Sequence, residues 1–298
     1  MKDQAEELRL LMRKVQASQN RGRPVGTGSR ILAVTSGKGG VGKTNITANL
    51  ALALARLGKE VLIFDADLGL ANTDVILGLH LPYNLSHLVR GEKEIEELVT
   101  RGPLGVRLVG GGSGLEELLT LGEWEVNRLV EKLARLEGLA EIILVDTGAG
   151  LSRSVVAFLT AAPEIMVVAT PEPTSLVDAY ATIKLVSQKN PAAGLYLLIN
   201  RARTPVEAGA AAERLALLSR RFLGREITLV GHVPSDEHVE RAVRAQIPFT
   251  LAYPQAPASR AMLLLAARLT ETAPPEPVTQ EASGLKGFLT RLSRFLTT

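Results

Sequence analysis

The sequence predicts an α/β protein built on a mostly parallel, doubly wound sheet with helices covering both faces. Two observations predict this fold. Short apolar runs alternate along the chain with longer helical stretches. The runs are also continuously apolar, as in strands that are buried on both faces of a parallel sheet. The chain has 298 residues, 46% of them hydrophobic, so it can bury one large core or two smaller ones.

The expected elements follow one another as strand and helix along most of the chain. Strands are expected at 30–35 (RILAVT), 60–65 (EVLIFD), 105–109 (GVRLV), 141–146 (EIILVD), 164–169 (EIMVVA), 195–200 (LYLLIN) and 227–232 (ITLVGH). Helices are expected at 43–57, 114–137, 152–162, 175–189, 205–222, 235–245 and 258–271.

Two linkers divide the chain into three parts. Residues 17–29 are polar and contain Gly and Pro, and residues 274–283 are rich in Pro. We therefore expect a short N-terminal helix with its linker at 1–29, one globular domain at 30–272, and a linker with a C-terminal helix at 273–298.

Composition excludes several classes of protein. The chain has no Cys, so it forms no disulfide, no thiolate zinc site and no cysteine-ligated iron–sulfur cluster. It also lacks an apolar run of the roughly 20 residues that a membrane-spanning helix needs. These features favour a cytoplasmic location.

The charge is unevenly distributed. Residues 1–30 carry seven basic and three acidic side chains, and residues 284–298 carry three basic and none acidic. The remaining 24 basic and 28 acidic side chains give residues 31–283 a net charge of −4. The two ends are therefore the expected contacts for anionic partners, and nucleic acid is not an expected partner of the body.

A phosphate-binding loop is the strongest motif. SGKGGVGKT, residues 36–44, follows the first strand and opens a helix, which is the setting that the pattern G-x-x-x-x-G-K-[ST] requires. Its backbone N–H groups would hold phosphates, Lys43 would reach the β- and γ-phosphates, and the Thr44 hydroxyl would bind Mg²⁺. The loop thus predicts a P-loop NTPase that binds ATP or ADP with Mg²⁺. The expected nucleotide-binding residues here are Gly37, Lys38, Gly39, Gly40, Val41, Gly42, Lys43, Thr44 and Asn45.

Acidic residues follow two of the strands. Asp146 ends the strand IILVD, as a Walker B aspartate does, and Asp65 and Asp67 follow the strand VLIF. In open sheets, ligands bind at the carboxyl edge where these residues lie. Taken alone, each would more often be a helix cap or a turn residue. Beside a P-loop they are predicted to be site residues, with Asp146 at the metal.

A second lysine in the loop narrows the class of P-loop NTPase. GKGGVGKT, with Lys38, resembles the deviant Walker A motif of the MinD/ParA group, in which this lysine contacts nucleotide across an ATP-dependent homodimer. The resemblance implies ATP hydrolysis in which Lys38 and Lys43 take part, Asp67 orients the attacking water and Asp65 supports Mg²⁺. It also implies that Asn200, Arg201 and Pro234 bind the nucleotide, with Asn200 and Pro234 at the base.

One position departs from the group's pattern. Where a typical member has Asp-Ser/Thr-Pro-Ala-Gly, this chain reads DTGAG, with Gly148 in place of the proline. The departure affects the flexibility of the second switch loop and hence the hydrolysis rate. Because cysteine is absent, the nitrogenase-reductase and iron–sulfur-carrier members are excluded, and the spatial regulators remain.

The C-terminal stretch GLKGFLTRLSRFLTT predicts an amphipathic helix. Its basic residues lie off an apolar stripe formed by Leu285, Phe288, Leu289, Leu292, Phe295 and Leu296. Such a helix is too short to span a bilayer but suits an interfacial anchor on an anionic membrane. The alternative is a helix packed on the body. The linker and the lack of acids favour the membrane, reached as an ATP-bound dimer at the inner face of the cell membrane.

The N-terminal run DQAEELR, residues 3–9, predicts a capped amphipathic helix, which from its residues alone could simply dock on its own domain. It resembles the activator helix of MinD-like flagellar number regulators (the FlhG/FleN/YlxH family). That resemblance implies that residues 1–20 stimulate the SRP-type GTPase FlhF through Gln4. It also implies flagellar C-ring proteins or a flagellar transcription regulator as partners. A division-site MinD-type ATPase and a partitioning ParA-type ATPase are the alternatives.

Overall fold

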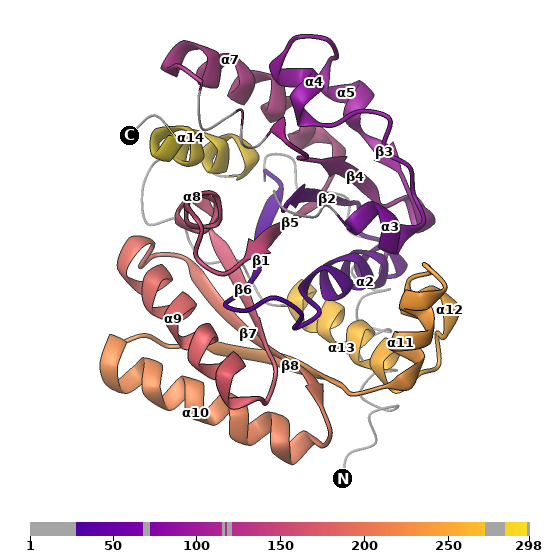
Figure 1. Ribbon diagram of the computed structural model, residues 1–298, viewed down its shortest axis with the longest axis vertical. Helices are drawn as coiled ribbons and strands as arrows, with labels where there is room; N and C mark the ends of the chain where they lie inside the picture. The colour runs from indigo at the N-terminus through magenta and orange to yellow at the C-terminus, as the bar shows by residue number, and fades with distance from the viewer. Residues whose placement is uncertain (1–27, 68–71, 115–116, 118–120, 272–283, 297–298) are drawn as a thin grey trace.

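The computed structural model describes residues 28–67, 72–114, 117, 121–271 and 284–296 (Figure 1). The N-terminal run with Gln4 and residues 1–20, and the linkers at 17–27 and 274–283, lie outside these ranges. So do the side chain of Leu296 and part of the helix expected at 114–137. Within the described ranges no helix is long and apolar enough to cross a membrane.

An eight-stranded sheet forms the centre of the protein, with the strand order β3-β4-β2-β5-β1-β6-β7-β8. Every neighbouring pair is parallel except β3 with β4. The strands are β1 (Arg30–Ser36), β2 (Val61–Ala66), β3 (Thr100–Arg101), β4 (Arg107–Gly110), β5 (Ile142–Ala149), β6 (Glu164–Ala169), β7 (Gly194–Ala202) and β8 (Thr228–Pro234). All seven expected strands are present. The two-residue β3 was not expected.

The longer helices match the expected ones, and several short ones were missed. The helices are α2 (Lys43–Arg56), α3 (Thr73–Leu77), α4 (Leu85–Val89), α5 (Ile95–Leu98), α7 (Glu123–Ala134), α8 (Arg153–Ala161), α9 (Pro173–Lys189), α10 (Pro205–Leu223), α11 (Glu237–Arg244), α12 (Phe249–Ala252), α13 (Pro257–Glu271) and α14 (Gly284–Leu296). Two 3₁₀ turns, η1 (Pro103–Gly105) and η2 (Arg135–Leu139), complete the described elements. The helix expected at 114–137 is described from Glu123 and ends at Ala134, where η2 follows.

The sheet has a separate hydrophobic core on each face. Along β1, Ile31 and Ala33 belong to one core, and Leu32 and Val34 belong to the other, as the two-residue period of a strand requires. Helices α7 to α10 and α14 supply the first core, and α2 and α13 supply the second (Figure 1). The fold is therefore the doubly wound one that the sequence predicts.

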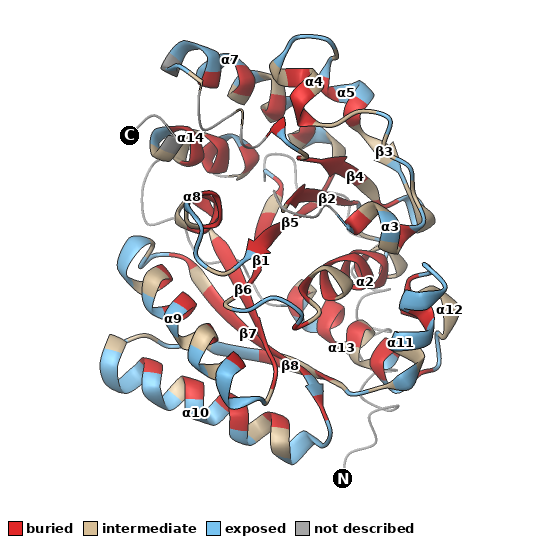
Figure 2. Ribbon diagram, in the orientation of Figure 1, coloured by how far each residue is buried: buried red, intermediate tan, exposed pale blue. Residues whose placement is uncertain are grey.

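The C-terminal helix α14 is docked on the body, with its apolar stripe facing the first core (Figure 2). Leu285, Phe288, Leu289 and Leu292 are all buried, and Phe295 is partly buried. The structure thus shows the packed arrangement, the alternative that the sequence reading ranked second. Contact of the same residues with a membrane stays a prediction, because it requires the helix to leave this groove.

Polar contacts fix both ends of the docked helix. The carboxylate of Glu137 in η2 accepts a hydrogen bond from the backbone N–H of Leu285 at 2.9 Å. Arg291 donates through Nε to the carbonyl oxygen of Ala161, also at 2.9 Å. Between these ends the ring of Phe288 stacks on Phe158 of α8, with the ring centroids 6.3 Å apart.

Candidate nucleotide-binding site

The loop between β1 and α2 has the backbone of a phosphate-binding loop. Gly42 precedes α2 with φ of 90°, a left-handed conformation that favours glycine. Gly37 packs so closely on α9 that a Cβ there would lie 2.2 Å from the carbonyl oxygen of Asp178. In front of the loop lies a cavity of about 460 Å³, bordered by Lys43, Asn45 and Asp67. The loop is thus held open toward a space that a nucleotide's phosphates can enter.

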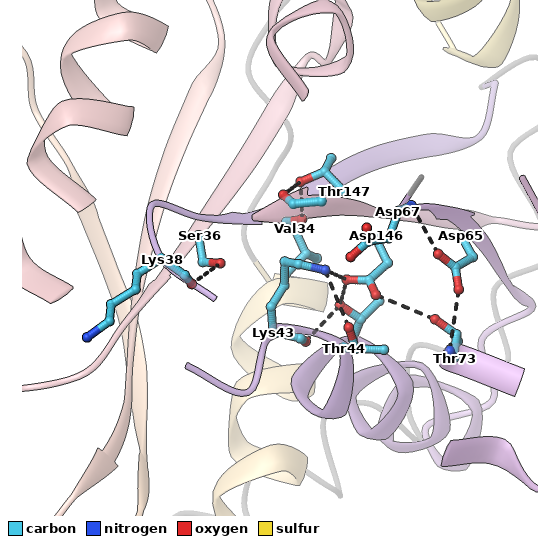
Figure 3. A network of polar contacts seen from close by, with 12 residues as sticks. Val34, Ser36, Lys38, Lys43, Thr44, Asp65, Asp67, Thr73, Asp146 and Thr147 are labelled. Atoms are coloured by element: carbon cyan, nitrogen blue, oxygen red, sulfur yellow. Dashed lines mark hydrogen bonds and ion pairs between the residues drawn. The ribbon is translucent and has the colours of Figure 1, made fainter. Parts of the chain in front are cut away.

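Lys43 is paired with Asp146 at the base of this cavity (Figure 3). Its Nζ lies 2.9 Å from Asp146 Oδ1, and the two side chains are 6% and 0% exposed. Thr47, one helical turn after Lys43, also donates to Asp146 Oδ1 at 2.9 Å. A buried charge destabilises the folded state unless an opposite charge and hydrogen bonds compensate it, as they do here for Lys43 and Asp146. In the described state, Lys43 is therefore held by Asp146 beside the cavity.

Two carboxylates, Asp65 and Asp146, lie on the neighbouring strands β2 and β5 and are register partners across them. Contrary to the sequence-based expectation, β5 does not end at Asp146 but continues to Ala149. Thr73, the first residue of α3, links them: its backbone N–H donates to Asp65 Oδ2 and its hydroxyl to Asp146 Oδ2, both at 3.4 Å. Burial and the nearby charge of Asp146 raise the pKa of Asp65 to about 6. A cation bound here would lower the cost of ionising Asp65.

The oxygen atoms gathered here fit Mg²⁺. The expected metal residues Thr44, Asp65 and Asp146 lie together in the site, and Thr73 adds a fourth oxygen donor. No group of three or more His, Cys, Asp and Glu side chains that could hold a metal occurs in the described part of the chain. Mg²⁺ typically takes one or two carboxylates and completes its shell with phosphate and water oxygens. The donor set therefore suits a metal that arrives with a nucleotide.

Lys38 lies apart from this cluster. Its Nζ is 3.2 Å from Thr174 Oγ1 and 3.8 Å from Glu172 Oε2, at the start of α9. The side chain is 44% exposed. Figure 3 shows it pointing away from Lys43. The structure thus brings only one of the two loop lysines to the chain's own phosphate cavity.

Asp67 borders the cavity and lies close to Gly148, which the structure places within β5 and not in a loop. Its backbone N–H donates to Asp65 Oδ1 at 3.1 Å, which holds the turn after β2. A Cβ on Gly148 would lie 3.4 Å from Asp67 Oδ1 and 3.3 Å from a methyl group of Val155. The absence of a side chain at position 148 therefore leaves space directly beside the Asp67 carboxylate.

The residues expected to contact the base of the nucleotide lie at the ends of β7 and β8. Asn200 donates through Nδ2 to the Val41 carbonyl oxygen at 2.7 Å, and Arg201 donates through Nη1 to the Gly40 carbonyl oxygen at 3.2 Å. Pro234 ends β8 opposite Ala202 of β7. Asn200 and Arg201 thus touch the phosphate loop, and Pro234 lies on the adjacent strand.

Sequence reasoning missed two residues of the site, Thr47 and Thr73. Thr47 lies four positions after Lys43 on α2, so the helical period alone places it on the same face. Thr73 lies within the stretch after β2 but is singled out only by its contacts with both carboxylates.

Comparison with known proteins agrees with this geometry. The family model of the CobQ/CobB/MinD/ParA nucleotide-binding domain matches residues 32–249. The chain is 40% identical over 240 residues to the antiactivator FleN of Pseudomonas aeruginosa, covering 80% of this chain and 86% of that protein. It is 35% identical over 270 residues to the flagellum site-determining protein YlxH of Helicobacter pylori, covering 90% and 91%.

A solved structure shares the fold. The septum site-determining protein MinD of Pyrococcus horikoshii, complexed with Mg-ADP, superposes with a TM-score of 0.65 at 26% identity. The match covers 80% of this chain and 94% of that one.

Proposed function

This chain belongs to the CobQ/CobB/MinD/ParA nucleotide-binding family and is an ATPase of the MinD/ParA type, and on that premise we propose that it regulates the number and placement of flagella. The observation that carries the proposal is its similarity to FleN and YlxH along most of the length of both proteins. The proposed reaction is hydrolysis of ATP by water to ADP and phosphate.

The proposed roles of the site residues rest on the resemblance to MinD/ParA ATPases and are compatible with the observed contacts. Lys43 exchanges Asp146 for the β- and γ-phosphates, and the loop N–H groups bind the remaining phosphate oxygens. Thr44, Asp65 and Asp146 would hold Mg²⁺, which when bound neutralises phosphate charge. Asp67 accepts a hydrogen bond from the attacking water and orients it. If Asp67→Ala leaves ATP turnover unchanged with membranes and partner proteins present, this role of Asp67 is wrong.

A homodimer is proposed for the ATP-bound state. Lys38 is 44% exposed and points away from its own phosphate cavity, so it can exchange its contacts with Thr174 and Glu172 for the nucleotide of a second copy. Substitution of Lys38 by Ala should abolish ATP-dependent dimers in light scattering while ADP binding to the monomer persists. Dimers formed equally well by the Lys38→Ala protein would exclude this contact.

The dimer is proposed to hold the inner face of the cell membrane through α14. Two helices acting together bind more tightly than one, because the second binds at a raised effective concentration. The helix must leave its groove, where Phe288 is 2% exposed. Liposome sedimentation tests this step. The intact protein should pellet with ATP, and a protein without residues 284–298 should stay in solution. Equal pelleting would refute the anchor.

The N-terminal run is proposed to act on another protein. Residues 1–20 would stimulate the SRP-type GTPase FlhF through Gln4, and C-ring proteins or a flagellar transcription regulator would bind elsewhere. A peptide of residues 1–20 should raise GTP hydrolysis by the FlhF of the same organism, and its Gln4→Ala version should not. A native peptide without effect would remove the main support for a flagellar over a division-site role.

A further inference from the structure

A second cavity lies at the free edge of the sheet, beside β8. It has a volume of about 240 Å³ and lies between β8, the start of α10 and one face of α13. None of the residues lining it lines the phosphate cavity. Figure 1 places β8, α10 and α13 at the far end of the sheet from β3. The established reaction gives this cavity no role.

The polar side chains lining this cavity are cationic or neutral. Arg203, His232 and Arg268 border it from three different elements, and no carboxylate is among the described residues that line it. Glu207, in the first turn of α10, turns to the backbone N–H of Arg203 at 2.6 Å and lies outside the lining. Burial and, after it, the positive potential of Arg268 lower the pKa of His232.

The backbone adds further donors to this potential. Thr204 and Pro205, at the start of the 19-residue helix α10, line the cavity. The N-terminus of a helix carries a partial positive charge that favours anions. A guanidinium group can donate two hydrogen bonds to a pair of phosphate oxygens. The helix N-terminus and the two guanidinium groups together therefore favour binding of a compact anion.

An added peptide strand is a poorer fit to this edge. The register of β8 against β7 shifts between Leu197 and Leu198, and Gly231 of β8 has φ of 155°. Arg268 also donates through Nη1 to the Val230 carbonyl oxygen at 3.3 Å. Bulges and covered carbonyls are the features that stop strands from pairing with an edge. The cavity is therefore suited to a small ligand.

We propose that this cavity is a second ligand site, which binds a small phosphorylated compound through Arg203, His232 and Arg268. The site lies next to nucleotide-binding elements, because Ala202 and Pro234 line it and end the two strands that carry the proposed base contacts. A ligand here would hold the ends of β7 and β8 together and so change the affinity for nucleotide at the P-loop.

Calorimetric titration of inorganic phosphate into the full-length protein, saturated with Mg-ADP, tests the site. Mg-ADP occupies the P-loop except for its γ-phosphate position, so substitutions in the second cavity are needed to assign any further saturable phosphate binding to that cavity. Arg203→Gln, at an exposed position, should weaken phosphate binding about tenfold, and Arg268→Gln should do the same. Arg260→Gln, on α13 but outside the lining, is the matched control and should bind as the wild type does.

The outcomes decide the proposal. Saturable binding that both cavity variants weaken and the control retains supports it. Succinate, titrated in the same way, distinguishes phosphate from carboxylate: equal binding of the two would overturn the phosphate assignment. Absence of saturable phosphate binding, or binding unchanged in Arg203→Gln and Arg268→Gln, would overturn the site itself. Because Arg203→Gln touches no buried contact, its result stands even if Arg268→Gln fails to fold.

Discussion

Lys43 Nζ lies 2.9 Å from Asp146 Oδ1, and this ion pair is almost completely buried. In the proposed function, phosphates compete with Asp146 for Lys43, and Mg²⁺ would then bind the carboxylate that Lys43 leaves. We therefore expect this ion pair to couple nucleotide binding to metal binding.

Substitution of Asp146 by Asn tests whether the ion pair opposes nucleotide binding in the absence of metal. Without its partner the buried Lys43 charge should destabilise the nucleotide-free protein by about 3–5 kcal/mol. Phosphates restore a partner, so ADP without Mg²⁺ should raise the melting temperature of the variant more than that of the wild type. Scanning calorimetry with ADP and EDTA measures both shifts. Glu131→Gln, an exposed change on α7, is the control. Equal ADP-induced shifts in variant and wild type would show that the ion pair does not oppose nucleotide binding.

Asp65 should make the stability of the nucleotide-free protein depend on pH. Burial and the charge of Asp146 raise its pKa from 3.8 to about 6 in the folded chain. The unfolded chain ionises this carboxyl at lower pH, so the folded state loses stability as the pH rises from about 4 to about 6. Two pKa units correspond to about 3 kcal/mol, which is the upper limit of the cost above that range.

Asp65→Asn tests this assignment. The variant should be more stable than the wild type by about 1–3 kcal/mol at about pH 7.5, and the gain should vanish at about pH 4. Urea unfolding at both pH values measures it. Added Mg-ADP should stabilise the wild type more than the variant, because the metal site has lost a carboxylate. A gain of the same size at both pH values would point to packing rather than to the charge of Asp65.

The sequence predicted those parts of the site that are formed by neighbouring residues or by a general rule of the fold, and it missed contacts that depend on how distant segments pack. The P-loop is one continuous motif, so its spacing predicted both its fold and the position of Lys43. Asp65 and Asp146 are 81 positions apart but lie in register on neighbouring parallel strands, and the rule that ligands bind at the carboxyl edge of such a sheet predicted that both belong to the site. Thr73 could not be identified in this way, because its contacts depend on how the chain after β2 folds back.

The C-terminal helix shows where a pattern leaves two outcomes open. Its apolar stripe suits a membrane surface and a hydrophobic groove equally, because both reward the same buried side chains. What decides between them in the described state is the groove itself, lined by residues such as Phe64, Leu133 and Phe158 from three elements distant in sequence. No local feature of residues 284–298 encodes it.

Gly148 should limit the rate of ATP hydrolysis. Gly148 lies next to the last residue of β5, where glycine samples more backbone states than proline does, and ordering one residue costs about 1 kcal/mol. Gly148→Pro should therefore raise turnover up to about fivefold, and Gly148→Ala should raise it less. Steady-state phosphate release at saturating ATP measures both. If turnover instead falls in both variants, the space that Gly148 leaves beside Asp67 is itself needed for the reaction.

Glu137 should control how often α14 leaves its groove. Its carboxylate accepts a hydrogen bond at 2.9 Å from the backbone N–H of Leu285 in the first turn of the helix, and it contributes nothing to the surface that would contact a membrane. Loss of such a cap costs about 1 kcal/mol, so Glu137→Ala should raise the undocked population about fivefold. In liposome sedimentation without nucleotide, a larger fraction of the variant than of the wild type should then be found in the pellet. Glu131→Ala, on the adjacent α7, should behave as the wild type does. Because α14 itself is unchanged in both proteins, equal recovery of variant and wild type would mean that docking does not restrain membrane binding.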